Sequence, residues 1–173
     1  LDNLIYGENL QLPVYIYLLK NDSEFKHANL VGFYLQKINI VLPKKGDGSL
    51  EEQIQKNLRL EGYTHPDYVD YIDNNRGEYL KNYKENKDTS VSKSSKIFND
   101  KDVEDLFELV SKKVDEAYNG IMNANFDITA KRIDGVNISC EYCPFVDCCY
   151  KTDKDIVELK GKKWKEEDEN ANE

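Results

Sequence analysis

The sequence contains no long hydrophobic run, no excess of positive charge and only one methionine. Its apolar stretches fall short of the roughly 18 residues that cross a bilayer. No basic start followed by an apolar stretch and a small-residue cleavage site marks a secretory signal. We therefore expect a cytoplasmic chain that does not contact a membrane. The net charge of −9 excludes a uniformly basic nucleic-acid clamp, because the overall field repels phosphate.

The chain does not start with methionine, since residue 1 is Leu1 and the one methionine is Met122. We therefore expect a fragment or a processed chain. Its 173 residues amount to about one domain. With 39% hydrophobic and 33% charged residues, the chain is polar, but not polar enough to be disordered throughout.

Hydrophobic patterning in the first quarter of the chain predicts a helix followed by a strand. Residues 10–19 are almost continuously apolar, which is typical of a helix buried on all sides. We expect Asn9 to cap this helix, which places Pro13 in the first turn, where a missing N–H costs little. Residues 29–42 alternate as a strand does, and the change of phase near Gln36 predicts a bulge.

Two further helices are predicted around a polar stretch. The capping-box spacing of Ser49–Glu52 opens a helix that we expect Gly62 to end. Residues 81–96 hold few apolar residues, so we expect a mobile loop that buries nothing. Apolar residues then recur at helical spacing over residues 103–121, with Asn99 as the expected N-cap.

Several residues whose side chains could take part in a functional site are not expected to form one. They are the histidines His27 and His65, the aspartates Asp67, Asp70 and Asp73, the tyrosines Tyr68, Tyr71 and Tyr79, and the basic segment Lys160–Lys165. We expect the histidines on surface loops, the aspartates on a solvated helix face and the tyrosines in packing contacts. The basic segment, which precedes an acidic end, is expected to be solvated rather than bound to DNA.

The four cysteines all lie within ten residues, at Cys140, Cys143, Cys148 and Cys149. Such a cluster indicates disulfides or a thiolate-bound metal. Disulfides are rare inside cells, so a metal site is favoured. One Cys-x2-Cys pair followed by a third thiol at Cys149 or Cys148 is compatible with an iron–sulfur cluster and with zinc. Spacing alone does not separate the two.

The spacing Cys140-x2-Cys143-x5-Cys149 resembles the C-terminal iron–sulfur motif of the AddB-type nuclease family, the RecB-like nuclease domains of bacterial helicase–nucleases. Gln11 and Tyr15 are similar to the Gln-x3-Tyr motif of RecB-like members of the PD-(D/E)xK superfamily. The resemblance covers about residues 5–152. It implies that the three cysteines bind a 4Fe–4S cluster with a distant upstream cysteine, that Cys148 is supernumerary, and that Gln11 and Tyr15 are auxiliary catalytic residues.

The resemblance also implies a fold and a function. We expect a helix-rich α/β fold, a partial restriction-endonuclease-like core that lacks its upstream strands and keeps at most one or two. The family's catalytic aspartate and Glu-x-Lys strand precede the Gln-x3-Tyr helix, so we expect residues 1–173 alone to be inactive. The implied parent is a Mg²⁺-dependent deoxyribonuclease subunit with a helicase–nuclease partner, which degrades DNA ends in double-strand break repair. The fragment itself is expected to hold zinc or no metal.

On this interpretation the chain has five segments. They are the back half of the nuclease core (1–42), a helical insertion with the polar loop (43–100), the long helix (101–122), the cysteine segment (123–159) and a disordered charged tail (160–173). Two alternatives stay open. One is a zinc-binding interaction module that uses Cys148 as its fourth ligand. The other is a different RecB-like nuclease, of phage or CRISPR-associated type, although the long insertion favours the AddB type.

Overall fold

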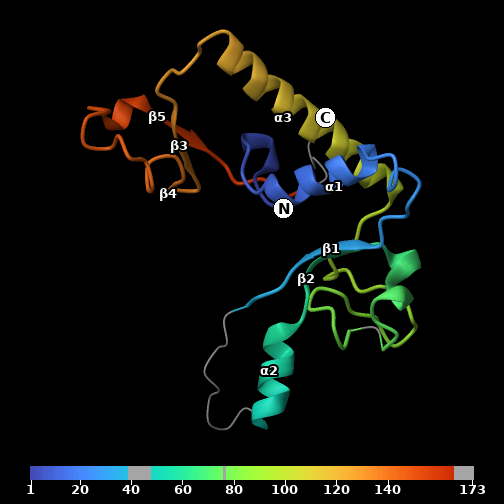
Figure 1. Ribbon diagram of the computed structural model, residues 1–173. Coiled ribbons are helices and arrows are strands. Elements are labelled where there is room, and N and C mark those ends of the chain that lie inside the picture. The colour runs from blue at the N-terminus through green and yellow to red at the C-terminus, as the bar shows by residue number, and fades with distance from the viewer. Residues whose placement is uncertain (39–47, 76, 166–173) are drawn as a thin grey trace, which may run out of the picture. The chain divides into compact units, whose positions relative to one another are not determined.

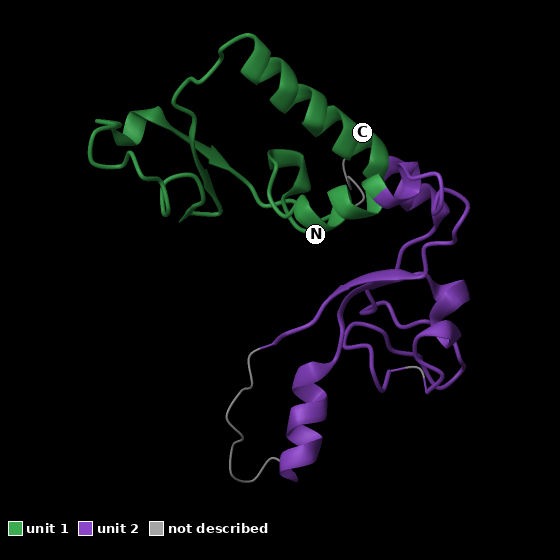
Figure 2. Cartoon of the chain, viewed as in Figure 1, with its two compact units in different colours: residues 1–18, 106–173 green, residues 19–105 purple. Residues whose placement is uncertain are grey.

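The computed structural model describes residues 1–38, 48–75 and 77–165 (Figure 1). The chain forms two compact units (Figure 2). Unit 1 comprises residues 1–18 and 106–173, and unit 2 comprises residues 19–105. In the described part of the chain, no helix is long and apolar enough to cross a membrane.

Unit 2 is built on a two-stranded antiparallel ribbon. Strand β1 (Gly32–Leu35) pairs with β2 (Glu61–Thr64), and Phe33 lies opposite Tyr63. The two rings stack with centroids 5.5 Å apart, and Phe98 lies 5.2 Å from Phe33 on the same apolar face. Aromatic pairs at such distances add to the stability that burial alone provides.

Helix α2 (Leu50–Leu58) begins as predicted but ends earlier. The Glu52 N–H donates to Ser49 Oγ at 3.2 Å, and the Ser49 N–H donates to the Glu52 carboxylate at 3.0 Å, which confirms the capping box. The prediction that Gly62 ends the helix is wrong, because the backbone is already extended at Arg59 and Gly62 belongs to β2.

The strand predicted over residues 29–42 is shorter than expected. Strand β1 covers Gly32–Leu35. Gln36 follows the strand, and its side-chain amide donates to the Leu58 carbonyl at 2.9 Å. The predicted change of phase involves residues 39–42, which lie outside the described residues.

The polar stretch 81–96 is an irregular but hydrogen-bonded loop. Tyr83 is only 1% exposed and lies in a cluster with Val69 and Leu80. The Lys96 N–H donates to the Asn82 carbonyl at 2.8 Å and so closes the loop. The expectation that this stretch buries nothing is therefore wrong, because a single tyrosine anchors it in the core.

Helix α1 (Gln11–Asn21) exposes much of its apolar surface. Pro13 and Ile16 are buried, whereas Tyr15, Leu18 and Leu19 are about half exposed or more. The prediction of a helix buried on all sides is therefore wrong in this structure. Asn9 does not cap the helix either, because α1 begins at Gln11 and Leu10 is the residue directly before it. The Asn9 side-chain amide instead donates to the Asp2 carbonyl at 3.0 Å.

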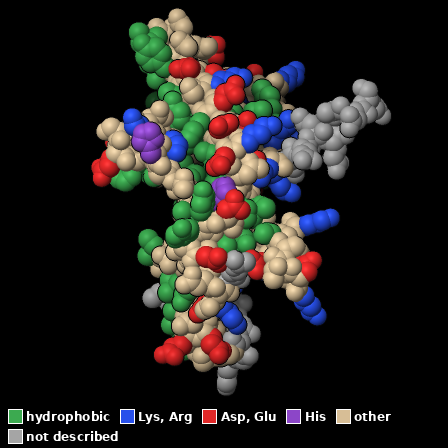
Figure 3. Space-filling view, turned by 90° about the vertical axis from the view of Figure 1, so that its right-hand side faces the viewer, with side chains coloured by type: hydrophobic (Ala, Val, Ile, Leu, Met, Phe, Trp, Pro, Cys, Tyr) green, Lys and Arg blue, Asp and Glu red, His purple; other side chains and the backbone are tan. Residues whose placement is uncertain are grey.

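Helix α3 (Asp100–Met122) matches the long helix predicted from periodicity. Leu106 and Val110 are fully buried, and the Tyr17 ring of α1 meets Phe107 edge-on at 5.7 Å. Farther along α3 the apolar side chains Val114, Tyr118 and Ile121 are exposed. Hydrophobic side chains also reach the surface on the face drawn in Figure 3.

The hydrogen bonds at the N-terminus of α3 test the prediction that Asn99 caps this helix. The Asp102 N–H donates to Asn99 Oδ1 at 3.0 Å, and the Asn99 N–H donates to Asp102 Oδ2 at 2.7 Å, so Asn99 is the N-cap. Asn99→Ala should lower the free energy of unfolding by about 1 kcal/mol. Urea titration measures this change. Asn99→Asp retains an acceptor and should stay near wild type, so an equal loss in both variants would contradict the capping role.

The cysteine segment of unit 1 lies in the connection between two strands of a three-stranded sheet. Strand β3 (Ala130–Ile133) pairs antiparallel with β4 (Val136–Asn137) and parallel with β5 (Ile156–Leu159). With β1 and β2, this makes five strands in the described residues. The expectation of at most one or two strands is wrong, because these strands are too short to show an alternating pattern.

The charged segment after β5 is part of the folded unit. The Asn3 N–H donates to the Lys162 carbonyl at 2.7 Å, and the Lys162 N–H donates to Asn3 Oδ1 at 2.9 Å. The Tyr6 hydroxyl donates to the Lys160 carbonyl at 2.9 Å. The expectation of a disordered tail from residue 160 is therefore wrong for residues 160–165. Residues 166–173 lie outside the described residues.

Candidate functional site

Gln11 and Tyr15 form a pair on the surface of α1. Gln11 is the first residue of the helix, and Tyr15 lies one turn later on the same face. Gln11 Nε2 donates to the Tyr15 hydroxyl oxygen at 3.0 Å. Both side chains are exposed, Tyr15 at 53%. The pair therefore presents an amide and a phenol, groups that bind phosphate oxygens or water.

A short irregular segment sets where α1 begins. The 3₁₀ turn η1 (Leu4–Tyr6) ends at Gly7, whose φ of 88° is a left-handed value that glycine adopts without strain. Leu4 is buried beneath this turn. The chain then reverses, and Pro13 occupies the first turn of α1, where it is buried and its missing N–H removes no helical bond. This geometry leaves Gln11 at the exposed start of the helix.

The cysteine segment consists of successive turns after β4. The Cys140 N–H donates to Asn137 Oδ1 at 3.1 Å, and the Cys143 N–H donates to the Cys140 carbonyl at 3.3 Å. Cys140, Cys143 and Cys149 are partly buried, while Cys148 is exposed. The Cys148 thiol donates to the Phe145 carbonyl at 3.5 Å. All four thiols are free of disulfides.

The chemistry of this donor set fits a thiolate-bound metal, because cysteine sulfur is the usual ligand of iron–sulfur clusters and of structural zinc. The arrangement is not convergent. Among the described residues, no three Cys, His, Asp or Glu side chains lie close enough together to hold a metal ion. The structure thus places the predicted cysteines on one turn-rich segment but does not gather them into a site.

Among the polar residues, Asp73 differs most from its predicted position on a solvated helix face. Its side chain is 0% exposed, and Oδ2 accepts the N–H groups of Gly77, Tyr79 and Leu80 at 2.8, 2.9 and 3.1 Å. The predicted solvated face therefore holds for Asp67 and Asp70 but not for Asp73. The signal was present in the turn-forming stretch that runs from Asp73 to Gly77, since aspartate often bonds to backbone N–H groups ahead of it in turns.

His65 was likewise expected at the surface but is buried. Its Nδ1 accepts the Asp67 N–H at 3.3 Å and caps the 3₁₀ helix η2 (Pro66–Tyr71). Its ring lies 5.4 Å from that of Phe98. His27 is exposed, as expected.

The three tyrosines expected to pack behave differently from one another. Tyr68 is partly buried, and its ring lies 4.7 Å from the His65 ring. Tyr71 is 83% exposed and Tyr79 is also exposed, so the packing prediction is wrong for both. On β1, burial raises the pKa of Tyr34, although a 3.0 Å hydrogen bond with Thr64 opposes the shift.

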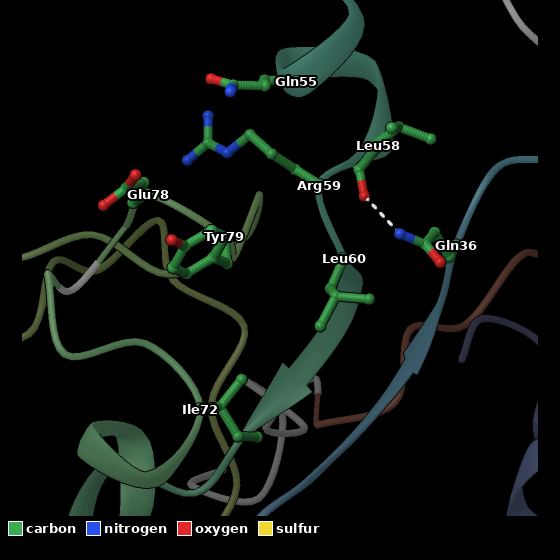
Figure 4. A pocket seen from close by; sticks show the side chains of 8 residues that line it. All are labelled: Gln36, Gln55, Leu58, Arg59, Leu60, Ile72, Glu78 and Tyr79. Atoms are coloured by element: carbon green, nitrogen blue, oxygen red, sulfur yellow. Dashed lines mark hydrogen bonds between the residues drawn. The ribbon is translucent and has the colours of Figure 1, made fainter.

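Unit 2 also contains a pocket of about 570 Å³, which the sequence did not indicate (Figure 4). Its lining combines apolar side chains with two amides and one residue of each charge: Gln36, Gln55, Leu58, Arg59, Leu60, Ile72, Glu78 and Tyr79. Arg59 Nη2 donates to the carbonyls of Gly77 and Leu80. Arg59 therefore ties the end of α2 to the segment that Asp73 organises.

Comparison with known proteins gives two kinds of match. The sequence profile of the PD-(D/E)XK nuclease superfamily matches residues 3–150. The chain is 28% identical to an ATP-dependent helicase/deoxyribonuclease subunit of Carboxydothermus hydrogenoformans and 26% identical to the subunit of the same name from Alkaliphilus metalliredigens. Each match covers 86% of this chain and 14% of the relative.

The profile match spans both motifs. It begins before Gln11 and ends just after Cys149. The helices and small mixed sheets of the structure agree with a partial α/β core of that fold. On these grounds, the chain belongs to the PD-(D/E)XK nuclease superfamily.

Proposed function

We propose that the chain is the C-terminal part of an AddB-like helicase/exonuclease subunit that degrades DNA ends in double-strand break repair. The names of the two relatives and the family membership support this proposal. The observation that carries it is the exposed Gln11–Tyr15 pair, hydrogen-bonded at 3.0 Å on the first turns of α1. A partner subunit, DNA as substrate and a cytoplasmic location belong to the same proposal.

In the proposed reaction, Gln11 and Tyr15 bind and orient the substrate. Gln11 has an amide carbonyl that accepts a hydrogen bond from water, while its Nε2 orients the Tyr15 hydroxyl. That hydroxyl donates to a phosphate oxygen. When bound in the whole enzyme, Mg²⁺ supplies polarisation of the scissile phosphate and an activated water. The pair then contributes by fixing the phosphate in line with the attacking oxygen.

We further propose that Cys140, Cys143 and Cys149 hold a 4Fe–4S cluster together with a distant cysteine. The thiol chemistry and the turn that links Cys140 to Cys143 support this set. Cys148 is left out because it is exposed and bonds to its own turn. The cluster would act as a staple that closes a long loop, since bringing distant segments together costs chain entropy.

The test of the proposed function uses the complete helicase–nuclease complex. Gln11→Ala and Tyr15→Phe should each slow Mg²⁺-dependent DNA cleavage by about 100-fold, because a misplaced phosphate loses alignment. ATP-driven unwinding should stay unchanged. Tyr71→Phe removes a hydroxyl from another exposed tyrosine and is the matched control, with cleavage expected at the wild-type rate.

Two results would count against the proposal in different ways. Wild-type cleavage by both variants would remove the role of Gln11 and Tyr15 but leave the nuclease intact. Absence of Mg²⁺-dependent cleavage by the complete wild-type complex would remove the nuclease function itself.

A further inference from the structure

The pocket of unit 2 has the size of a binding site and is open to solvent. Its volume of about 570 Å³ lies within the range of about 300–1,000 Å³ that is usual for ligand sites. Most of its lining residues are exposed: Gln36, Gln55, Leu58, Glu78 and Tyr79. Such a pocket can admit a group that stays attached to a longer chain outside it.

The wall of the pocket that carries Tyr79 is held in place from both sides. The Tyr79 N–H donates to Asp73 Oδ2 at 2.9 Å, and the Tyr79 carbonyl accepts the Leu60 N–H at 2.9 Å. Next to it, Arg59 Nη2 donates to the Leu80 carbonyl at 2.8 Å. Tyr79 itself is nevertheless 54% exposed. The pocket therefore contains an aromatic side chain that is accessible although its backbone is fixed.

Arg59 has hydrogen-bonding capacity that the described residues do not use. Its Nη2 donates to the carbonyls of Gly77 and Leu80, and these bonds orient the guanidinium. Its Nε is a buried donor without a hydrogen-bond partner in the described part of the chain. Buried donors are normally paired with protein, water or a ligand. An acceptor that enters the pocket can therefore bind this guanidinium while its bonds to the backbone stay in place.

The lining favours a neutral polar group over an anion. It contains one arginine, Arg59, and one glutamate, Glu78, so the formal charges of the lining cancel. Figure 4 shows the Arg59 guanidinium extending toward Gln55 and Glu78. Leu60 and Ile72 lie away from this polar end. A guanidinium donates hydrogen bonds and a carboxylate accepts them. The pocket therefore suits a flat group that has donors and acceptors on its edge and apolar faces.

We propose that this pocket binds an unpaired nucleobase of single-stranded DNA, stacked on Tyr79 with its polar edge toward Arg59 and Glu78. The inference rests on the proposed nuclease function and adds a DNA contact in unit 2, whereas Gln11 and Tyr15 belong to unit 1. Stacking on an aromatic ring accepts any base, because every base has a π-face. The sugar and phosphate stay outside the open pocket, so the pocket does not contribute to the salt dependence of binding.

The test measures binding of single strands to the complete helicase–nuclease complex without divalent metal. The probes are an oligothymidylate and an abasic oligonucleotide of the same length, each titrated over a range of salt concentrations. Tyr79→Ala should weaken binding of the oligothymidylate about tenfold, as expected for the loss of one stacked base. The slope of log affinity against log salt should keep its wild-type value, because no phosphate contact is lost. Binding of the abasic probe should not change, and Tyr79→Phe, which keeps the ring, should bind both probes like wild type.

Tyr71→Ala is the matched control, because Tyr71 is an exposed tyrosine of the same unit that does not line the pocket. It should leave both affinities unchanged. Wild-type affinity of Tyr79→Ala for the oligothymidylate would overturn the inference, as would an equal loss for the abasic probe or in Tyr71→Ala. Dissociation of the partner subunit from the Tyr79→Ala complex would also overturn it, in favour of a protein ligand. Because cleavage by the wild-type complex is measured separately, failure of the base pocket and failure of the nuclease function give different results.

Discussion

Asp73→Ala should lower the free energy of unfolding by about 3–5 kcal/mol, a loss as large as that expected for truncating a fully buried core side chain. The carboxylate is fully buried, and one of its oxygens accepts three backbone N–H groups between Gly77 and Leu80. Alanine leaves these donors without an acceptor, and each unpaired buried polar group costs about 1–3 kcal/mol. Relaxation of the partly exposed loop keeps the total below the sum.

Urea unfolding of residues 1–173 measures the total loss, and amide hydrogen exchange at Gly77, Tyr79 and Leu80 locates it. Asp73→Asn keeps an acceptor oxygen and should cost about 1–2 kcal/mol. Asp67→Ala is the matched control, because Asp67 is an exposed aspartate six residues earlier, and the change should stay within about 0.5 kcal/mol. Equal losses for Asp73→Ala and Asp67→Ala would contradict the role of the buried carboxylate.

Cys149→Ser should abolish iron binding, whereas Cys148→Ser should leave it intact. The complete subunit, purified without oxygen, is expected to be brown and to carry about four irons per chain. Serine oxygen replaces thiolate sulfur poorly at iron, so loss of one proposed ligand releases the cluster. Cys148 differs from the other three cysteines in being exposed and in donating to the Phe145 carbonyl at 3.5 Å.

The same measurement separates the cluster from the zinc alternative. Metal analysis and visible absorbance are recorded for wild type and both serine variants. A colourless protein with one zinc per chain, lost in Cys148→Ser, would refute the iron–sulfur proposal and favour an interaction module. The two variants form a matched pair, because they remove neighbouring thiols of the same segment.

Local elements of the fold followed directly from the sequence. The starts of α2 and α3 lie where the capping residues Ser49 and Asn99 predicted them. Capping is readable because the bonds join residues three positions apart, so no distant contact decides them. The pairing of Gln11 with Tyr15 is local in the same sense, since a separation of four residues puts both side chains on one helix face.

Helical periodicity predicted burial in the first half of α3, where Leu106 and Val110 are buried, but not beyond Val114, which is exposed. Tyr83 lies in a stretch whose composition indicates a solvated loop, but a cluster with Val69 and Leu80 buries it. In the opposite sense, Leu18 and Leu19 on α1 are apolar but exposed. The amino-acid composition of a segment indicates how strongly the segment as a whole favours burial. Which individual side chains do so depends on the surfaces that other segments offer.

The sequence by itself determined the helix-rich α/β class, the two motifs and their order along the chain, and the family to which they point. Only the tertiary structure decided that Asp73 is a buried acceptor and that the backbone of residues 160–162 lies near the start of α1, held by bonds to Asn3 and Tyr6. The physical reason is the range of the interactions. Caps and helix faces involve neighbours in the chain, whereas the bonds from Asn3 and Tyr6 to residues 160–162 join positions more than 150 residues apart.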